Sequence, residues 1–319
     1  MPPGEFELIE RFFTHRGAAR EDVRLGVGDD AALVAPRAGA ECVLALDTLV
    51  EGAHFPAGMD ARFVGHRALA VNLSDLAAMG AEPAWALLGL TLPSADEHWL
   101  AGFSAGLDTL ARRFNVALIG GDTTRGPLTV TIALAGSVPA GAALLRSGAR
   151  PGDDLWISGT PGDAAAGLAI LQGRLQGQGR ARDALLHRFQ LPEPRVALGV
   201  ALRGIATACI DVSDGLAGDL AKLCAASGVG ADVESRELPL SAGLCSIVGP
   251  EARRRFALGG GDDYELLFTA PAGHRARLAA LEAGAVLRRI GVVSETAGVR
   301  IDGAPPEREA GHGFDHFAG

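Results

Sequence analysis

The hydrophobic pattern of the chain alternates between two kinds of segment. Short runs, such as the start of residues 128–138 (LTVTIALAGSV), alternate apolar and polar positions as a half-buried strand does. Longer Ala- and Leu-rich runs, such as residues 63–79, carry apolar side chains at helical spacing and predict helices. A chain that alternates such runs is expected to adopt an α/β or α+β fold.

A turn-rich segment interrupts this pattern near the middle of the chain. Residues 146–152 (RSGARPG) combine two glycines with a proline, and the strand-like run DLWIS follows them. Domain boundaries fall in loops of this composition, and a chain of 319 residues is long enough for about two domains. We therefore expect an N-terminal domain over residues 1–146 and a C-terminal domain over residues 147–319.

Three predicted strands lead to an aspartate. Residues 43–46 are expected to form a buried strand that ends at Asp47, and the run VALI leads through a glycine pair to Asp122. The third aspartate of this kind is Asp211. Ligand sites of α/β folds gather beyond strand ends, and glycines let the backbone approach a ligand closely.

Further aspartates extend this set. Asp29 and Asp30 are adjacent, and two carboxylates about 4 Å apart repel by about 4 kcal/mol at an effective dielectric constant near 20, which a solvated turn or a cation would relieve. Oxygen ligands without zinc-type Cys or His spacing select Mg²⁺ or Mn²⁺, which often completes its shell with water and phosphate. We predict a nucleotide-phosphate site built around several metal ions. Its candidate ligands are Asp30, Asp47, Asp75, Asp122, Asp211 and Asp214.

Each of these residues, taken alone, has an ordinary structural explanation. A Gly-Asp pair is most often a turn, and Ser213 with Asp214 could simply cap the following helix. His54 alone is more often a core or surface histidine, and Arg146 alone an ordinary surface arginine. The recurrence of strand-end aspartates in both halves favours the metal site.

Composition and charge narrow the function. With 48% hydrophobic and 21% charged residues the chain predicts a globular protein, and its net charge of −9 argues against nonspecific nucleic-acid binding. Lys222 is the only lysine and lies in a predicted helix, and the chain has neither a GxxxxGK[ST] phosphate loop nor the HRD and DFG signatures of protein kinases. Phosphate charge would then be met by metals, arginines and backbone N–H groups.

The cysteines and the N-terminal sequence predict a soluble cytoplasmic protein. The four cysteines form no CxxC pair, as expected for reduced thiols. The N-terminal run MPPGEFELIERFF carries three glutamates and no apolar core, so it does not predict a secretory signal. Residues 128–145 carry no charge but alternate like a strand and include a proline, so we expect no membrane span there.

Ten sequence motifs together resemble those of the thiamine-monophosphate kinases, a branch of the superfamily of aminoimidazole ribonucleotide synthetase and selenophosphate synthetase. The resemblance covers residues 4–317. In chain order the motifs are GEFELIERFF, GVGDDAAL, DTLVEGAHF, ALAVNLSDLAAMGAEP, LIGGDTTRGPL, RSGARPGD, GTPGDAAAGLAIL, DVSDGL, GGDDYELLF and GFDHFAG.

This resemblance implies a two-domain aminoimidazole ribonucleotide synthetase-like architecture. The N-terminal domain would pair its strands with a second subunit in a barrel-like homodimer interface, and ATP would bind between the two domains. The six aspartates listed above would bind several Mg²⁺ ions. ATP contacts would come from Gly121, Asp122, Arg146 and Ser213, and thiamine monophosphate contacts from His54, Asp262 and Phe314.

Three positions depart from the family pattern. Family members often have Ser-Thr where this chain has Ala45 and Leu46, so only backbone carbonyls remain there to help hold a metal. Asp262 replaces the glutamate of GGEDYEL and is one methylene shorter. Phe314 replaces a tyrosine or tryptophan, so it can stack but cannot donate a hydrogen bond.

The reaction that the resemblance implies is the transfer of a phosphoryl group from ATP to thiamine monophosphate, giving thiamine diphosphate. Because the attacking phosphate oxygen is already anionic, no general base is expected, and metals would neutralise charge during an in-line transfer.

Two alternatives remain. One is a related ATP-using synthetase, although the reactive N-terminal Cys and Lys of selenophosphate synthetase and the C-terminal Cys of the hydrogenase-maturation relative are missing here. The other is a nucleotide-binding regulator without catalysis, which the departures at Ala45, Leu46 and Asp262 would favour.

Overall fold

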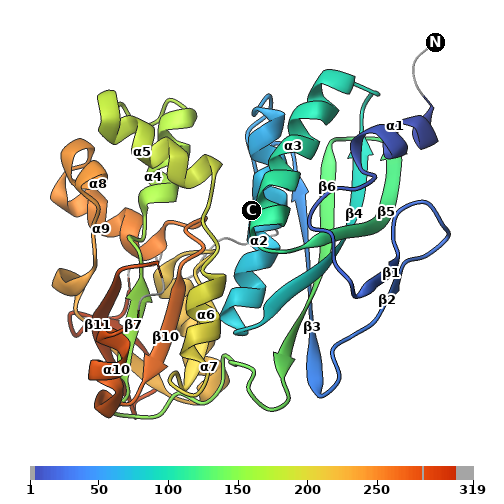
Figure 1. Cartoon of the computed structure of the whole chain (residues 1–319). Helices are drawn as coiled ribbons and strands as arrows, with labels where there is room; N and C mark the ends of the chain where they lie inside the picture. The colour runs from blue at the N-terminus through green and yellow to red at the C-terminus, as the bar shows by residue number, and fades with distance from the viewer. Residues whose placement is uncertain (1–3, 282–283, 307–319) are drawn as a thin grey trace. The chain divides into compact units, whose positions relative to one another are not determined.

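The computed structural model describes residues 4–281 and 284–306, which form helices and strands in two compact units (Figure 1). The first unit contains residues 1–76 and 81–141, and the second contains residues 77–80 and 142–319. Both units combine helices with a β-sheet, so the α/β prediction is confirmed.

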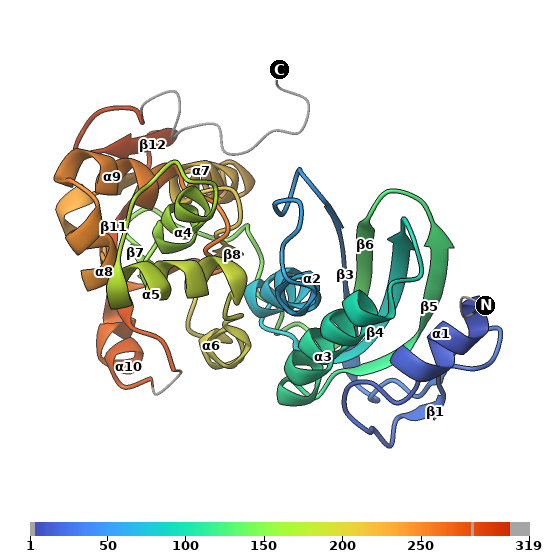
Figure 2. The same ribbon diagram turned by 90° about the horizontal axis from the view of Figure 1, so that it is seen from above.

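The first unit is built on a four-stranded sheet in the order β3-β6-β4-β5, in which only β4 and β5 are parallel. Helices α2 and α3 lie on the same face of this sheet (Figure 2). The elements are α1 (Glu5–Phe12), β1 (Val23–Leu25), β2 (Leu33–Val34), β3 (Ala40–Val50), α2 (Ala61–Ala78), β4 (Glu82–Leu92), α3 (Glu97–Arg113), β5 (Ala117–Arg125) and β6 (Thr129–Pro139).

Strand β6 follows the period-2 pattern that predicts it. Val130, Ile132 and Leu134 are buried, whereas Thr129 and Thr131, which alternate with them, point to the opposite, helix-free face and are only partly buried. The uncharged run 128–145 is therefore a strand and a loop. In the described part of the chain, no helix has the length and apolar character needed to cross a membrane.

Strand β3 differs from its prediction. It extends over 11 residues, and Asp47 lies within it, paired with Ile132 of β6, instead of following its end. Leu44 and Leu46 are 75% and 64% exposed because alternate side chains of the strand face away from the helices. The apolar run 43–46 was wrongly predicted to be buried, since the sequence does not reveal that one face of this sheet carries no helix.

The helix-free face of the first unit is only partly covered. The hairpin β1–β2 packs over Trp85 and Ile119, with Val23 and Val34 contributing apolar contacts. Further along the sheet, Leu87 of β4 is 43% exposed and lies in register with Leu46 of β3, across Ala133 of the intervening strand β6. We call Leu44, Leu46 and Leu87 the open apolar face.

The second unit contains a six-stranded sheet in the order β12-β9-β11-β7-β10-β8, antiparallel except for β12 and β9. The apolar faces of its strands and of helix α7 form one core, and α4, α5 and α8 enclose a second. The elements are β7 (Asp154–Ser158), α4 (Asp163–Leu171), α5 (Gly179–Gln190), α6 (Val196–Leu202), β8 (Ala208–Asp211), α7 (Leu216–Ser227), β9 (Gly230–Val233), α8 (Ala242–Ile247), α9 (Pro250–Gly259), β10 (Leu266–Ala270), α10 (Arg275–Ala279), β11 (Leu287–Ser294) and β12 (Gly298–Ile301), with short 3-10 turns at Ser235–Glu237 and Ala272–His274.

Candidate functional site

A cavity of about 940 Å³ in the first unit contains several of the predicted site residues. Asp30, Gly121 and Asp122 line it, together with apolar side chains that include Phe6 and Leu87. A cavity of this size can hold a nucleotide-sized ligand. A lining that combines carboxylates with apolar side chains suits a ligand that has both charged and apolar parts.

The glycine before Asp122 is required by the backbone. Gly121 has φ +153°, and a Cβ atom there would lie 1.9 Å from the carbonyl oxygen of Leu88. Strand β5 does not end at this point, because pairing with β4 continues past Asp122 to Arg125. The prediction that Asp122 follows a strand end is therefore wrong, although the residue still lines the cavity.

The adjacent aspartates Asp29 and Asp30 lie in the β1–β2 loop. The Asp29 carboxylate accepts a hydrogen bond of 2.8 Å from the backbone N–H of Asp30, and both residues are exposed and line the cavity. A solvated turn therefore relieves part of their repulsion. Carboxylate oxygens are the kind of donor that Mg²⁺ prefers, and Asp29, Asp30 and Asp122 supply them to one cavity.

Helix α2 carries Asp75, which is partly buried. Asn72, one turn earlier, is fully buried and donates from Nδ2 to the carbonyl oxygen of Ala68 at 3.1 Å. Its Oδ1 has no hydrogen-bond partner among the described residues. A buried carbonyl oxygen in this state is costly unless water or a cation satisfies it, so it also fits a bound cation.

His54 lies in the turn that follows β3. Its Nδ1 accepts a hydrogen bond of 3.0 Å from the backbone N–H of Val50. In the neutral ring this places the proton on Nε2, which is then a donor. Local backbone geometry therefore fixes the tautomer of the histidine.

In the second unit, Asp211 ends β8 and is buried, which confirms the predicted strand end. Ser213 and Asp214 follow in the loop before α7, but their side chains do not cap this helix. The N-cap position is occupied by Gly215 and makes no side-chain capping bond. Instead, the Asp219 carboxylate accepts bonds of 3.0 Å from the backbone N–H groups of Ser213 and Asp214.

Asp262 lies in a second loop of the same unit, between α9 and β10. It lines a cavity of about 500 Å³ together with Arg174, Arg255 and Phe256. Asp262 and Tyr264 both have left-handed backbone conformations, with φ +69° and +52°. Such conformations are costly for residues other than glycine and persist only where the surroundings hold them, which makes this loop a candidate ligand site.

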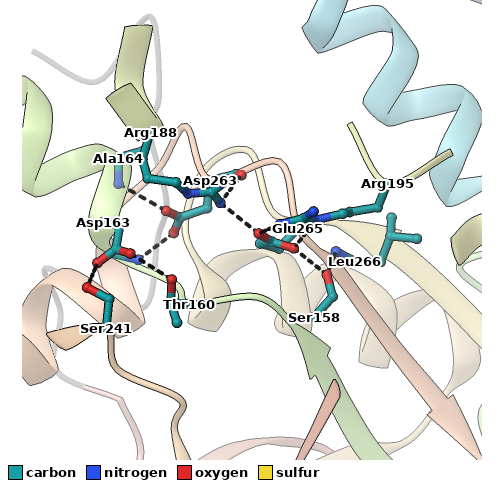
Figure 3. Close-up of polar contacts among 11 residues, drawn as sticks. Ser158, Thr160, Asp163, Ala164, Arg188, Arg195, Ser241, Asp263, Glu265 and Leu266 are labelled. Carbon is teal, nitrogen blue, oxygen red and sulfur yellow. Dashed lines mark hydrogen bonds and ion pairs between the residues drawn. The ribbon is translucent and has the colours of Figure 1, made fainter. Parts of the chain in front are cut away.

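The residue between these two holds the loop in place. Asp263 is buried, and its carboxylate accepts bonds from the backbone N–H groups of Gly162 at 2.6 Å and Ala164 at 3.3 Å, at the start of α4 (Figure 3). Burial raises the pKa of the Asp263 carboxyl well above its usual range, in opposition to these bonds. The side chain thus fixes the loop to a helix N-terminus.

Glu265, at the other end of the loop, is fully buried between two arginines (Figure 3). Arg188 and Arg195 each approach its Oε1 to 2.6 Å, while Arg195 Nε and the Ser158 hydroxyl donate to Oε2. Burial opposes ionisation, but these donors hold the pKa of the Glu265 carboxyl below its usual range. This network was not predicted from the sequence, and its signal was the three acidic residues Asp262, Asp263 and Glu265 in the run GGDDYELLF.

The structure places the remaining predicted residues as follows. Arg146 is exposed in the loop that leads to β7, and Phe314 lies outside the described residues. Over residues 4–281 and 284–306, no three His, Cys, Asp or Glu side chains form a group that could hold a metal ion. Asp30 and Asp122 share a cavity, while the six-aspartate metal set as a whole stays a prediction.

Two family models match the chain and define its class. Residues 28–138 match "AIR synthase related protein, N-terminal domain" and residues 150–303 match "AIR synthase related protein, C-terminal domain". The two-domain α/β fold and its glycine- and aspartate-rich loops therefore belong to the AIR synthase-related class, as the resemblance predicts.

Individual relatives narrow this class further. Thiamine-monophosphate kinase of Escherichia coli K12 is 48% identical, over 100% of this chain and 99% of the relative. The crystal structure of thiamine-monophosphate kinase from Stenotrophomonas maltophilia K279a is 47% identical with a TM-score of 0.87, covering 90% of this chain and 93% of that one. AaThiL, complexed with AMPPCP and TMP, is 33% identical with a TM-score of 0.80, covering 91% and 92%. The chain belongs to the thiamine-monophosphate kinase family.

Proposed function

We propose that this protein transfers the γ-phosphoryl group of ATP to thiamine monophosphate, producing thiamine diphosphate and ADP. The observation that carries the proposal is the cavity that Asp30, Gly121 and Asp122 line together, with no side chain possible at Gly121. AaThiL, a relative with the same fold, binds AMPPCP and TMP, and this supports the same pair of ligands here.

We propose a separate set of residues for each ligand. Gly121, Asp122, Arg146 and Ser213 would contact ATP, and His54, Asp262 and Phe314 would contact thiamine monophosphate. His54 could donate from Nε2, because its Nδ1 is already occupied by the Val50 N–H. Magnesium ions would be held by Asp30, Asp47, Asp75, Asp122, Asp211 and Asp214.

The chemistry requires alignment more than proton transfer. The acceptor phosphate is anionic at neutral pH, so the protein need only bring two phosphate groups together and offset their charge. Bound Mg²⁺ supplies the charge neutralisation. The β5 segment at Gly121 and the loop at Asp262–Glu265 would then fix the positions of the two substrates.

A chromatographic assay of the purified protein with ATP tests this function. Thiamine monophosphate and free thiamine are supplied in parallel, with and without Mg²⁺. Formation of thiamine diphosphate from the monophosphate alone, and only with Mg²⁺, supports the proposal and shows that Ala45, Leu46 and Asp262 are tolerated. ATP binding without product would favour a nucleotide-binding regulator.

We further propose that the protein is a homodimer formed through the open apolar face. Leu44, Leu46 and Leu87 are too exposed to stabilise a monomer, and burying them against a second copy would be favourable. Leu46→Asp should shift the protein to monomer in sedimentation velocity, whereas Val286→Asp, at an exposed apolar residue of the second unit, should not. A wild-type monomer at micromolar concentration would contradict this interface.

The four cysteines are unpaired, which suits a reducing compartment. We therefore propose that the protein works in the cytoplasm. Cell fractionation with a periplasmic marker as control would test this assignment.

A further inference from the structure

A buried carboxylate of the second unit, outside the proposed ligand set, controls the loop that carries part of that set. Asp219 lies in the first turn of α7 and is 1% exposed. Its Oδ2 accepts hydrogen bonds of 3.0 Å from two consecutive backbone N–H groups, those of Ser213 and Asp214. Bonds from N–H groups to a carboxylate are stronger than neutral ones, so this side chain fixes the path of the loop.

The other oxygen of this carboxylate is held by the only lysine of the chain. Lys222, one turn along α7, donates to Asp219 Oδ1 at 2.8 Å and to Asp214 Oδ2 at 2.6 Å. We call Asp219, its two backbone hydrogen bonds and Lys222 the clamp. The Lys222 ammonium group connects the Asp219 carboxylate to the side chain of Asp214, a proposed metal ligand. With both oxygens engaged, the Asp219 side chain has one orientation.

The same loop is also bonded to the loop that carries Asp262. The carbonyl oxygen of Ser213 accepts from the Asp262 N–H at 2.8 Å, and that of Val212 accepts from the Tyr264 N–H at 2.9 Å. Gly215 has φ +118°, and a Cβ atom there would lie 2.9 Å from the backbone of Gly259. A shift of either loop would therefore move the other.

We infer that Asp219 is a positioning residue for the nucleotide site, acting through the backbone of Ser213 and Asp214, and that Lys222 fixes the orientation of its carboxylate. The inference rests on the proposed function, in which Ser213 and Asp214 contact ATP and metal. An amide in place of the carboxylate turns an N–H donor toward either Lys222 or the loop. The loop then relaxes, and both ligand-binding residues leave their places.

The variants Asp219→Asn and Lys222→Met separate this role from a merely structural one. Asp154→Asn is the matched control, because Asp154 is equally buried in the same unit and bonds Arg275 and Arg289 away from both loops. Titration calorimetry gives the Kd for AMPPCP with Mg²⁺, chemical denaturation gives stability, and the product assay gives kcat and KM.

Misplacing a group of an active site by about 1 Å can lower the reaction rate about 100-fold. We expect Asp219→Asn to raise the Kd for AMPPCP at least about tenfold and to lower kcat. Lys222→Met should have a smaller effect in the same direction, and Lys222→Arg should restore part of it. Asp154→Asn should lose stability with a Kd within about twofold of wild type.

A Kd for Asp219→Asn within twofold of wild type overturns the inference, as does an equal rise in the Asp154→Asn control. If Asp219→Asn does not fold, the Lys222→Met and Lys222→Arg pair decides by the same criterion. A wild type that binds AMPPCP but makes no thiamine diphosphate overturns the proposed function alone. The Kd of Asp219→Asn for AMPPCP, compared with wild type and with Asp154→Asn, still tests the positioning role of Asp219. A wild type that binds no AMPPCP overturns both.

Discussion

Replacing Glu265 with glutamine should destabilise the second unit strongly while changing almost no volume. The carboxylate accepts four hydrogen bonds, three of them from Arg188 and Arg195, whose side chains are only 18% and 13% exposed. An amide removes the negative charge and turns its N–H₂ group toward one of these donors. Two largely buried guanidinium groups then lose the carboxylate to which both are hydrogen-bonded.

The expected loss of free energy of unfolding follows from the removal of this shared carboxylate. Breaking a buried ion pair by removing one partner costs about 3–5 kcal/mol. In a domain of this size each kcal/mol lowers Tm by about 2–4 °C, so the variant should melt roughly 6–20 °C lower. Surface pairs contribute about 0–1 kcal/mol, and Glu237→Gln, which removes a partly exposed partner of the exposed Arg236 and Arg288, is the control.

Urea denaturation followed by tryptophan fluorescence measures both variants. Trp156 is the one tryptophan in the second unit, so replacing Trp85 and Trp99 with phenylalanine makes the signal specific for that unit. If Glu265→Gln falls within 1 kcal/mol of Glu237→Gln, the buried network does not hold the unit together and the reasoning is refuted.

Three further predictions concern other parts of the molecule. Gly121→Ala should cost about 2–4 kcal/mol in urea denaturation, because the new Cβ meets the Leu88 carbonyl, whereas Gly120→Ala meets only the flexible end of Leu87 and should cost less. With a thiol reagent at pH 8, exposed Cys42 should react quickly and, since it shares a face with Leu44 and Leu46, more slowly as protein concentration rises. Burial raises the pKa of the Cys224 thiol to about 11 and that of Cys209 further, so either one reacting as fast as Cys42 would contradict the fold. The Arg275 hydrogen bond lowers the pKa of the Asp154 carboxyl below 3.8, so its stabilisation is present above that pH and lost as pH falls through the lower folded value. The stability gap between wild type and Asp154→Asn should therefore narrow in acid titrations below about pH 4, and a constant gap would contradict the shift.

The sequence by itself determined the local structure and the family. Helix α2, strand β6 and the strand end at Asp211 follow from the spacing of apolar positions, and β6 buries alternate residues on one face of its sheet. The ordered series of motifs identified the family over almost the whole chain.

Only the tertiary structure decided what those residues contact. Whether residues 43–46 are buried depends on a helix-free sheet face that no local pattern reveals, and Asp47 lies within a strand because β6 pairs beyond it. Glu265 finds Arg188 and Ser158 at sequence separations of 77 and 107 residues, and Asp263 finds the start of α4 at a separation of 101. The sequence shows where charges stand along the chain, but the free energy of a buried charge depends on partners that only folding brings within hydrogen-bond distance.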